Sequence, residues 1–273
     1  MPATAEIMAE TASLRGSRAR SAAPMPLAWG AFRRKMEDTN LCPIWTPLFI
    51  HRRRLFEYIS ATLPSVLAAC HHSTATSELK VLDVGCGQMP YRSLFAGRSG
   101  IASYEGADIE GEHAVAVRID PVSERILAED DSYDLIVSFQ TLEHVPRADR
   151  LLKECMRILR PGGVFFCTAP FIFEYHAVPG DYHRWTVDGL ACELGVAGFS
   201  AIVAEPVESD WESLISVAEL VIARKLGYLL GKPVFFALNL LGFLPMRIIP
   251  GHLPLTVAAW GTKQAQADRL PDR

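Results

Sequence analysis

Short apolar runs alternate with amphipathic stretches through the middle of the chain. The first run, at residues 79–84, contains β-branched side chains and predicts a buried strand. Similar runs predict further strands at 102–107, 115–119, 133–138, 164–169, 199–205 and 255–259. A helix at 147–159 would gather its apolar residues on one face, namely Leu151, Leu152, Cys155, Ile158 and Leu159. Alternating strands and helices predict an α/β domain.

The flanks differ in character from this core. Residues 1–40 are rich in Ala, Ser and Arg without periodicity and predict a disordered or extended tail, and 264–273 predict a short polar one. From Thr46, apolar residues at three- and four-residue steps predict a helix whose opposite side carries the arginines 52–54 as a solvated face. We expect one domain at 41–263.

An apolar insert at about 211–253 interrupts the end of this domain. Its longest stretch without formal charge, 233–246, has 14 residues. A helix needs about 20 apolar residues to cross a bilayer, so we do not expect a membrane span. Two interpretations remain: an interfacial lid that lies on a membrane, or a helical subdomain or dimer surface folded against the core.

Composition narrows the class of protein. Of 273 residues, 49% are hydrophobic, which is ample for a core, and the net charge of −4 does not indicate a nucleic-acid partner. The six cysteines form no C-x-x-C pair and no zinc-like spacing. We therefore expect free thiols in a reducing, cytoplasmic compartment, and no metal site.

The first predicted strand leads into the candidate chemistry. It carries Asp83 near its end and is followed by Gly85 and Gly87, which would let the backbone approach a ligand closely. Asp108 ends the second strand, 25 positions after Asp83, where a doubly wound fold places an acid against a ribose. A carboxylate can accept both ribose hydroxyl hydrogens at once. The alternative for each residue is an ordinary turn.

These residues belong to an ordered series of motifs. Asp-Val-Gly-Cys-Gly at 83–87 is followed by segments at 104–108, 120, 133–145 and 151–170. The series resembles class I S-adenosylmethionine (SAM)-dependent methyltransferases, most closely the type 11-like branch that acts on small molecules, lipids and sugars. The resemblance implies a Rossmann-like, seven-stranded, mostly parallel sheet with an antiparallel last strand. It also implies SAM as cofactor, held by Asp83, Gly85, Gly87, Asp108, Ile109, Asp120 and Gln140.

The segment after the fifth strand would form the acceptor side. Residues 170–186 concentrate aromatics, carboxylates and two histidines, which favours a pocket wall over a loop held only by its own aromatics. Neutral histidine is the usual proton acceptor for an alcohol or phenol. The candidates for catalysis or acceptor binding are His144, His176 and His183. DNA and protein-glutamine amino-methyltransferases carry an Asn/Asp-Pro-Pro-aromatic run after the fourth strand. This sequence lacks that run, which disfavours an amide or base-nitrogen acceptor.

We therefore predict a transferase that moves a methyl group from SAM, with oxygen of a small-molecule, sugar or lipid-linked acceptor as the expected target. One alternative is a SAM-binding partner protein without catalysis. Another is a nicotinamide-dependent oxidoreductase, which Pro90 disfavours because it stands where that motif needs its third glycine. Peripheral membrane association and a homodimer are left open, and no nucleic-acid partner is expected.

Overall fold

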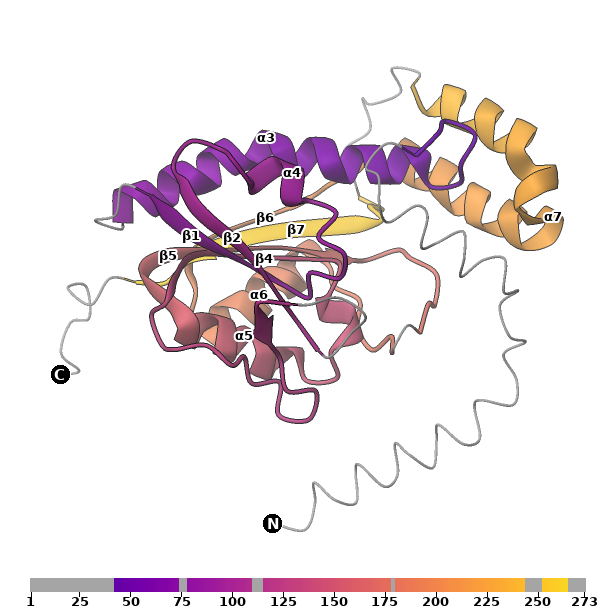
Figure 1. Ribbon diagram of the computed structural model, residues 1–273. Helices are drawn as coiled ribbons and strands as arrows, with labels where there is room; N and C mark the ends of the chain where they lie inside the picture. Colours follow the sequence, from indigo (N-terminus) through magenta and orange to yellow (C-terminus); the bar gives the residue numbers. More distant parts are fainter. Residues whose placement is uncertain (1–41, 74–77, 110–114, 178–179, 244–251, 265–273) are drawn as a thin grey trace, which may run out of the picture. The chain divides into compact units, whose positions relative to one another are not determined.

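The computed structural model describes residues 42–73, 78–109, 115–177, 180–243 and 252–264 (Figure 1). The chain divides into two units, Met1–Thr39 and Asn40–Arg273, and the described residues all belong to the second. The tail expected at 1–40 lies outside the described residues, as does nearly all of the tail expected at 264–273.

The described residues form a seven-stranded sheet. Its order is β3-β2-β1-β4-β5-β7-β6, and β7 runs antiparallel to both of its neighbours while the other neighbouring strands run parallel. The strands are β1 (Leu79–Val84), β2 (Ile101–Asp108), β3 (Val117–Arg118), β4 (Tyr133–Phe139), β5 (Leu159–Pro170), β6 (Ser200–Pro206) and β7 (Thr256–Thr262). This confirms the predicted mostly parallel sheet with an antiparallel last strand.

The strand order reverses between β1 and β4. From β1 the chain moves outward through β2 and β3, and then returns to the other side of β1 as β4. At such a reversal the connections from neighbouring strands leave in opposite directions, which opens a crevice beyond the carboxyl ends of the strands. The loops after β1 and β4 therefore border the expected ligand crevice.

Helices cover both faces of the sheet (Figure 1). On one face lie α3 (Phe49–Ser73) and the short α4 (Arg92–Phe95), and on the other lie α5 (Ala148–Ile158) and α6 (Val187–Ala197). Successive residues of the central strands therefore alternate between two cores. Val81, Leu135 and Phe166 pack with α3, whereas their neighbours Leu82, Ile136 and Phe165 belong to the core beneath α5 and α6. Burial on both faces explains why these strands are continuously apolar.

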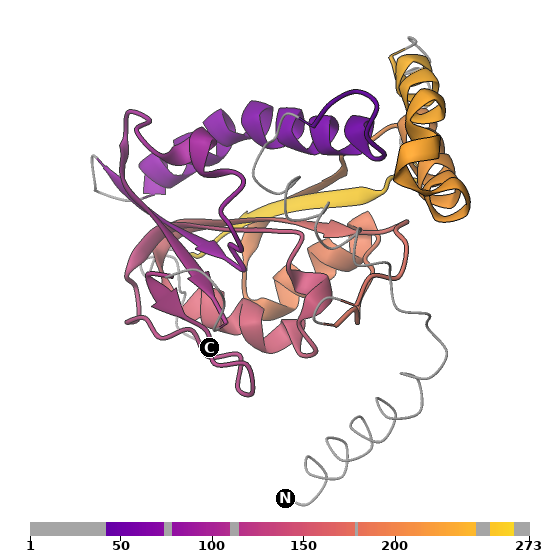
Figure 2. The same ribbon diagram turned by 45° about the vertical axis from the view of Figure 1, so that its right-hand side comes forward.

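The apolar insert is a broken helix, α7 (Asp210–Gly242), whose two halves lie side by side (Figure 2). A capping box of Ser209 and Glu212 starts it, and Gly227, with φ 71° and ψ 170°, interrupts it. The indole Nε1 of Trp211 donates to the Leu241 carbonyl at 3.0 Å, which joins the first turn to the last. Within the described residues, no helix is long and apolar enough to cross a membrane.

Candidate active site

The loop after β1 is shaped by a close approach to the loop after β4. Gly85 has φ +74°, and a Cβ placed on it would lie 2.0 Å from the Thr141 side-chain methyl. The Thr141 hydroxyl in turn donates to the Gly85 carbonyl at 3.2 Å. Only glycine can occupy this position without strain and collision, because other residues pay for a positive φ and would displace Thr141. The two loops bordering the crevice are thus held in direct contact.

Asp108, the last residue of β2, holds the second glycine of the loop after β1, which is called the glycine loop below. Its Oδ2 accepts from the Gly87 N–H at 2.8 Å, and its Oδ1 accepts from the Ile109 N–H at 2.7 Å. A carboxylate has about four acceptor positions, so two backbone bonds leave capacity for two ligand hydroxyls. Gly87 itself has φ +47° and no atom within 4 Å of a Cβ placed on it, which leaves the backbone open beside Asp108.

Asp83 lies buried beneath this loop, with 3% of its surface exposed. Burial raises the pKa of Asp83 to about 7, the Tyr104 hydroxyl that donates to Oδ2 opposes that rise, and the negative charge of Asp108 adds to it. A buried carboxylate with a raised pKa is stabilised in its charged form by a cation placed against it. The pair Asp83 and Asp108 therefore suits a ligand with one cationic group and a diol.

Two further predicted cofactor residues have local structural roles. Asp120 accepts from the backbone N–H groups of Val122 and Ser123 at 2.9 and 2.8 Å, and these bonds lower the pKa of its exposed carboxyl. Gln140 adopts a positive φ of 54° directly after β4, and its side-chain amide donates to the Thr168 hydroxyl at 3.2 Å. Their contacts with adenine and with the methionine part of the cofactor remain predictions.

The short helix η1 (Leu142–His144) follows Thr141 and carries Glu143 and His144. Both lie close to His176, which comes from the loop after β5. Glu143 Oε1 lies 3.7 Å from His144 Nε2 and 4.0 Å from His176 Nε2, and the two imidazole centroids are 4.9 Å apart. Burial raises the pKa of Glu143 to about 8 and lowers the pKa of His176. On its β4–β5 side the crevice thus has a cluster in which burial disfavours the charged forms of Glu143 and His176.

A salt-bridged loop holds His176 in place. The carboxylate of Asp181 pairs with Arg184 and also accepts from the His176 backbone N–H at 2.9 Å. The ring of Phe173 lies 5.1 Å from that of His176 and 5.6 Å from that of His51 on α3. This segment is therefore fixed by ion pairs as well as by its aromatics.

The three predicted histidines do not lie together. His144 and His176 share the cluster with Glu143, whereas the His183 ring lies tilted against that of Trp185, with centroids 5.2 Å apart, and places Nε2 3.2 Å from the Pro146 carbonyl oxygen. The motif segment 133–145 contains Glu143, but only its neighbour His144 was predicted as a site residue. An acidic residue directly before His144, at the end of an apolar strand, was the available signal.

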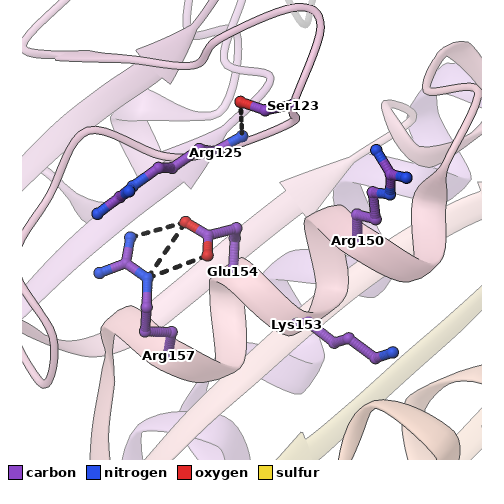
Figure 3. Close-up of a pocket in the computed structure, with 6 residues that line it drawn as sticks. All are labelled: Ser123, Arg125, Arg150, Lys153, Glu154 and Arg157. Carbon is purple, nitrogen blue, oxygen red and sulfur yellow. Dashed lines mark hydrogen bonds and ion pairs between the residues drawn. The ribbon is translucent and has the colours of Figure 1, made fainter. Parts of the chain in front are cut away.

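A second hollow, of about 460 Å³, lies on the surface around α5 and the 123–125 turn (Figure 3). It is lined by Ser123, Arg125, Arg150, Lys153, Glu154 and Arg157. Its positive charge is partly neutralised from within, because Arg157 pairs with Glu154 at 2.7 Å and Arg150 lies 3.8 Å from Glu124. These ion pairs make it a weak anion site, and none of its residues belongs to the crevice loops.

Comparison with known proteins assigns the family. The sequence model of the methyltransferase domain family matches residues 49–192, more than half of the chain. The protein belongs to this family, and the matched residues form a SAM-dependent methyltransferase domain of class I.

Individual relatives match over shorter stretches. A Mycolicibacterium smegmatis protein named a probable S-adenosylmethionine-dependent methyltransferase is 37% identical over 97 residues, which are 33% of this chain and 37% of the relative. The ubiquinone biosynthesis O-methyltransferase of Pectobacterium atrosepticum is 37% identical over 103 residues, 33% of this chain and 42% of the relative. The chain thus spans about two fifths of the length of these relatives. A SAM-dependent methyltransferase from Archaeoglobus fulgidus is 19% identical, with a TM-score of 0.44, over 76% of this chain and 94% of that structure.

The crevice residues fit the cofactor of this family. The bare backbone at Gly87 leaves room for a ligand, and the Asp108 carboxylate retains acceptor capacity for a ribose diol. The charged form of the buried Asp83 would be stabilised by a cation such as the cofactor's ammonium group. The nicotinamide alternative is wrong.

Proposed function

We propose that the protein methylates an oxygen atom of a small-molecule, sugar or lipid-linked acceptor. The observation that carries the proposal is the cluster of Glu143, His144 and His176 beside the cofactor loop, because a hydroxyl acceptor must lose a proton. Relatives over the matched region include ubiquinone biosynthesis O-methyltransferases, which supports oxygen as the methylated atom.

In this mechanism the chain supplies position and proton transfer. SAM when bound offers a methyl group on a positively charged sulfur. The cofactor is oriented from the β1–β2 side by Asp108, Gly87 and Asp83. Thr141 contacts Gly85 and so fixes the distance between the cofactor loop and the acceptor side. Holding two reactants in line can supply an effective molarity of about 10⁵ M or more. The acceptor's proton leaves toward the histidine cluster.

The loop beyond β5 forms the rest of the acceptor side. Phe173 offers an apolar wall between His176 and His51, and Arg224 of α7 pairs with Glu174 at 2.6 Å. His183, whose ring packs at a tilt against Trp185, acts as an acceptor-binding group at the rim, so its loss should raise KM more than it lowers kcat. His176→Ala should lower kcat and leave SAM affinity unchanged.

The test uses the purified protein, isotopically labelled SAM and solvent extracts of its host cells. The expected result is a product heavier by one labelled methyl group whose ether bond resists mild base, and whose formation falls at least tenfold in His176→Ala. SAM binding without transfer to any extract would favour the partner protein without catalysis. Transfer to nitrogen or carbon would refute oxygen as the target.

The broken helix α7 supports a membrane-derived acceptor. Next to the break at Gly227, the side chains of Leu229 and Leu230 are 75% and 74% exposed. Two lysines, Lys225 and Lys232, lie on either side of them in the sequence. Exposed leucines flanked by lysines suit the surface of an anionic bilayer. In a flotation assay we expect the intact protein to rise with vesicles that contain phosphatidylserine. The double variant Leu229→Glu/Leu230→Glu should remain in the fraction without vesicles. Dimerisation through these leucines without flotation would refute this part of the proposal.

A further inference from the structure

We propose that Glu143, His144 and His176 bind one divalent transition-metal ion of the Zn²⁺ type at the acceptor side of the crevice. Binding of the ion does not depend on the proposed function. Its role in methyl transfer rests on that function.

The geometry of the three side chains is that of ligands around a common centre. One ligand atom from each residue lies within 4.8 Å of the others, and Glu143 Oε1 is 3.7 and 4.0 Å from the two Nε2 atoms. Ligand atoms bound about 2.1 Å from one tetrahedral ion lie roughly 3.4 Å apart, so the three side chains would close by a few tenths of an ångström on binding it. Hydrogen bonds between these groups would need about 3 Å, so direct bonding does not account for the arrangement.

Backbone contacts set the tautomer of both histidines. His144 Nδ1 lies 2.5 Å from the Gly180 carbonyl oxygen, and His176 Nδ1 lies 2.9 Å from the Glu174 carbonyl oxygen. A carbonyl only accepts, so each Nδ1 carries the hydrogen and each neutral ring presents its lone pair at Nε2. Metal-binding histidines use the same arrangement, with the second ring nitrogen donating to a carbonyl or carboxylate.

Glu143 supplies an independent observation. Its side chain is 1% exposed, and neither carboxylate oxygen has a hydrogen-bond partner among the described residues. Burying an ionised carboxylate without a partner is costly, and native proteins normally pair such groups or use them to bind metals. Arg184, a cation whose charge acts on Glu143, is already paired with Asp181. A bound cation would supply the missing partner.

The ligand types select the ion. Two imidazoles and one carboxylate bind Zn²⁺ in known catalytic sites, and the same set suits other first-row divalent ions, whereas Mg²⁺ prefers oxygen ligands. Three protein ligands also leave a position open.

The acceptor's hydroxyl oxygen would fill this position, and a bound ion lowers the pKa of such a group. With an ion bound, the Nε2 lone pairs of the two histidines are occupied, so the acceptor loses its proton to solvent instead of to the histidine cluster. An oxygen–carbon bond then forms, and the carbon–sulfur bond of the sulfonium breaks to leave a neutral thioether. The substrate class is therefore a phenol or another hydroxyl compound able to coordinate a metal.

The metal test uses the chelator-treated full chain and Zn²⁺ or Co²⁺ alone. We expect calorimetry to give one site per chain, Co²⁺ to produce visible d–d absorption, and Zn²⁺ to raise the melting temperature until EDTA is added. Glu143→Gln and His176→Ala should weaken Zn²⁺ binding by more than about 100-fold, beyond the 10–100-fold typical of outer-shell partners. His252→Ala, which removes an exposed histidine outside the cluster, should bind as the parent does.

The outcomes separate this inference from the proposed function. Absence of stoichiometric Zn²⁺ and Co²⁺ binding by the parent chain overturns the metal site, and so does unchanged affinity in both folded variants. Methyl transfer to oxygen that survives complete chelation also overturns the role of the ion while leaving the proposed function intact. Metal binding by a chain that transfers no methyl group to oxygen would leave the site standing and refute the proposed function.

Discussion

Replacing Gly85 by alanine should damage both stability and cofactor binding, because the contact with Thr141 leaves no space for a side chain. A non-glycine residue in the left-handed region costs about 1–2 kcal/mol. A Cβ at 2.0, 2.4 and 2.7 Å from three Thr141 side-chain atoms adds an overpacking cost of about 1–3 kcal/mol. The sum, about 2–5 kcal/mol, corresponds to a fall in melting temperature of roughly 4–20 °C for a domain of this size.

Gly87→Ala is the matched control. Gly87 also has a positive φ, +47°, but no atom lies within 4 Å of the added Cβ, so only the backbone cost of about 1–2 kcal/mol applies. Differential scanning calorimetry and SAM titration of both variants provide the comparison. Gly85→Ala/Thr141→Ala should recover part of the loss, because the nearest atom of Thr141 is then removed while its Cβ at 2.7 Å remains. Equal melting temperatures for the two single variants would refute this reasoning, whereas a lower SAM affinity is expected of both, because a Cβ on Gly87 would enter the space left for the ligand.

Three further predictions concern carboxylates. Asp108→Ala should weaken SAM binding by about 1–3 kcal/mol in calorimetry, since ribose hydroxyls and the Gly87 N–H lose their acceptor; unchanged affinity in a folded variant would contradict the ribose role. SAM affinity should rise as pH increases through about 7, because Asp83 must ionise to attract a cation, and Asp83→Asn should abolish this dependence in titrations at pH 6–8. The pKa of Glu219 is raised from 4.5 to about 8 by burial, so its contribution to stability is present below pH 4.5 and lost as pH rises toward 8. Glu219→Gln keeps an acceptor for the Leu48 N–H, and urea denaturation should show it gaining stability over the parent between pH 5 and 9, whereas a constant difference would contradict the assignment.

Local patterns predicted the sheet because strand burial and turn chemistry are encoded over a few residues. The strand at 79–84 and the helix at 147–159 match β1 and α5 closely. The strand expected at 164–169 begins earlier, at Leu159, because Leu159 already pairs with Tyr133. The helix expected to run to 159 therefore ends at Ile158, and β5 begins at the next residue.

Long-range contacts were beyond local patterns. The arginines 52–54 were expected on a solvated face, and this is wrong for Arg54, whose side chain is 16% exposed and pairs with Glu212 of α7. The two residues are 158 positions apart, so neither spacing nor composition could indicate the pair. The cluster of Glu143, His144 and His176 depends likewise on β4 and β5 lying side by side, which brings the end of one strand against the loop that follows the other.

The contact between Gly85 and Thr141 constrains how this enzyme can be redesigned or can diverge. Thr141 precedes Glu143 and His144 by only two and three residues, so a substitution that shifts η1 to admit a new acceptor also moves the wall of the cofactor loop. Selection for altered substrate range at 142–144 should therefore yield variants that need more SAM to reach half-maximal rate. Phe173 and Glu174 touch His51 and Arg224 rather than the glycine loop, so libraries built there can change substrate range without that penalty.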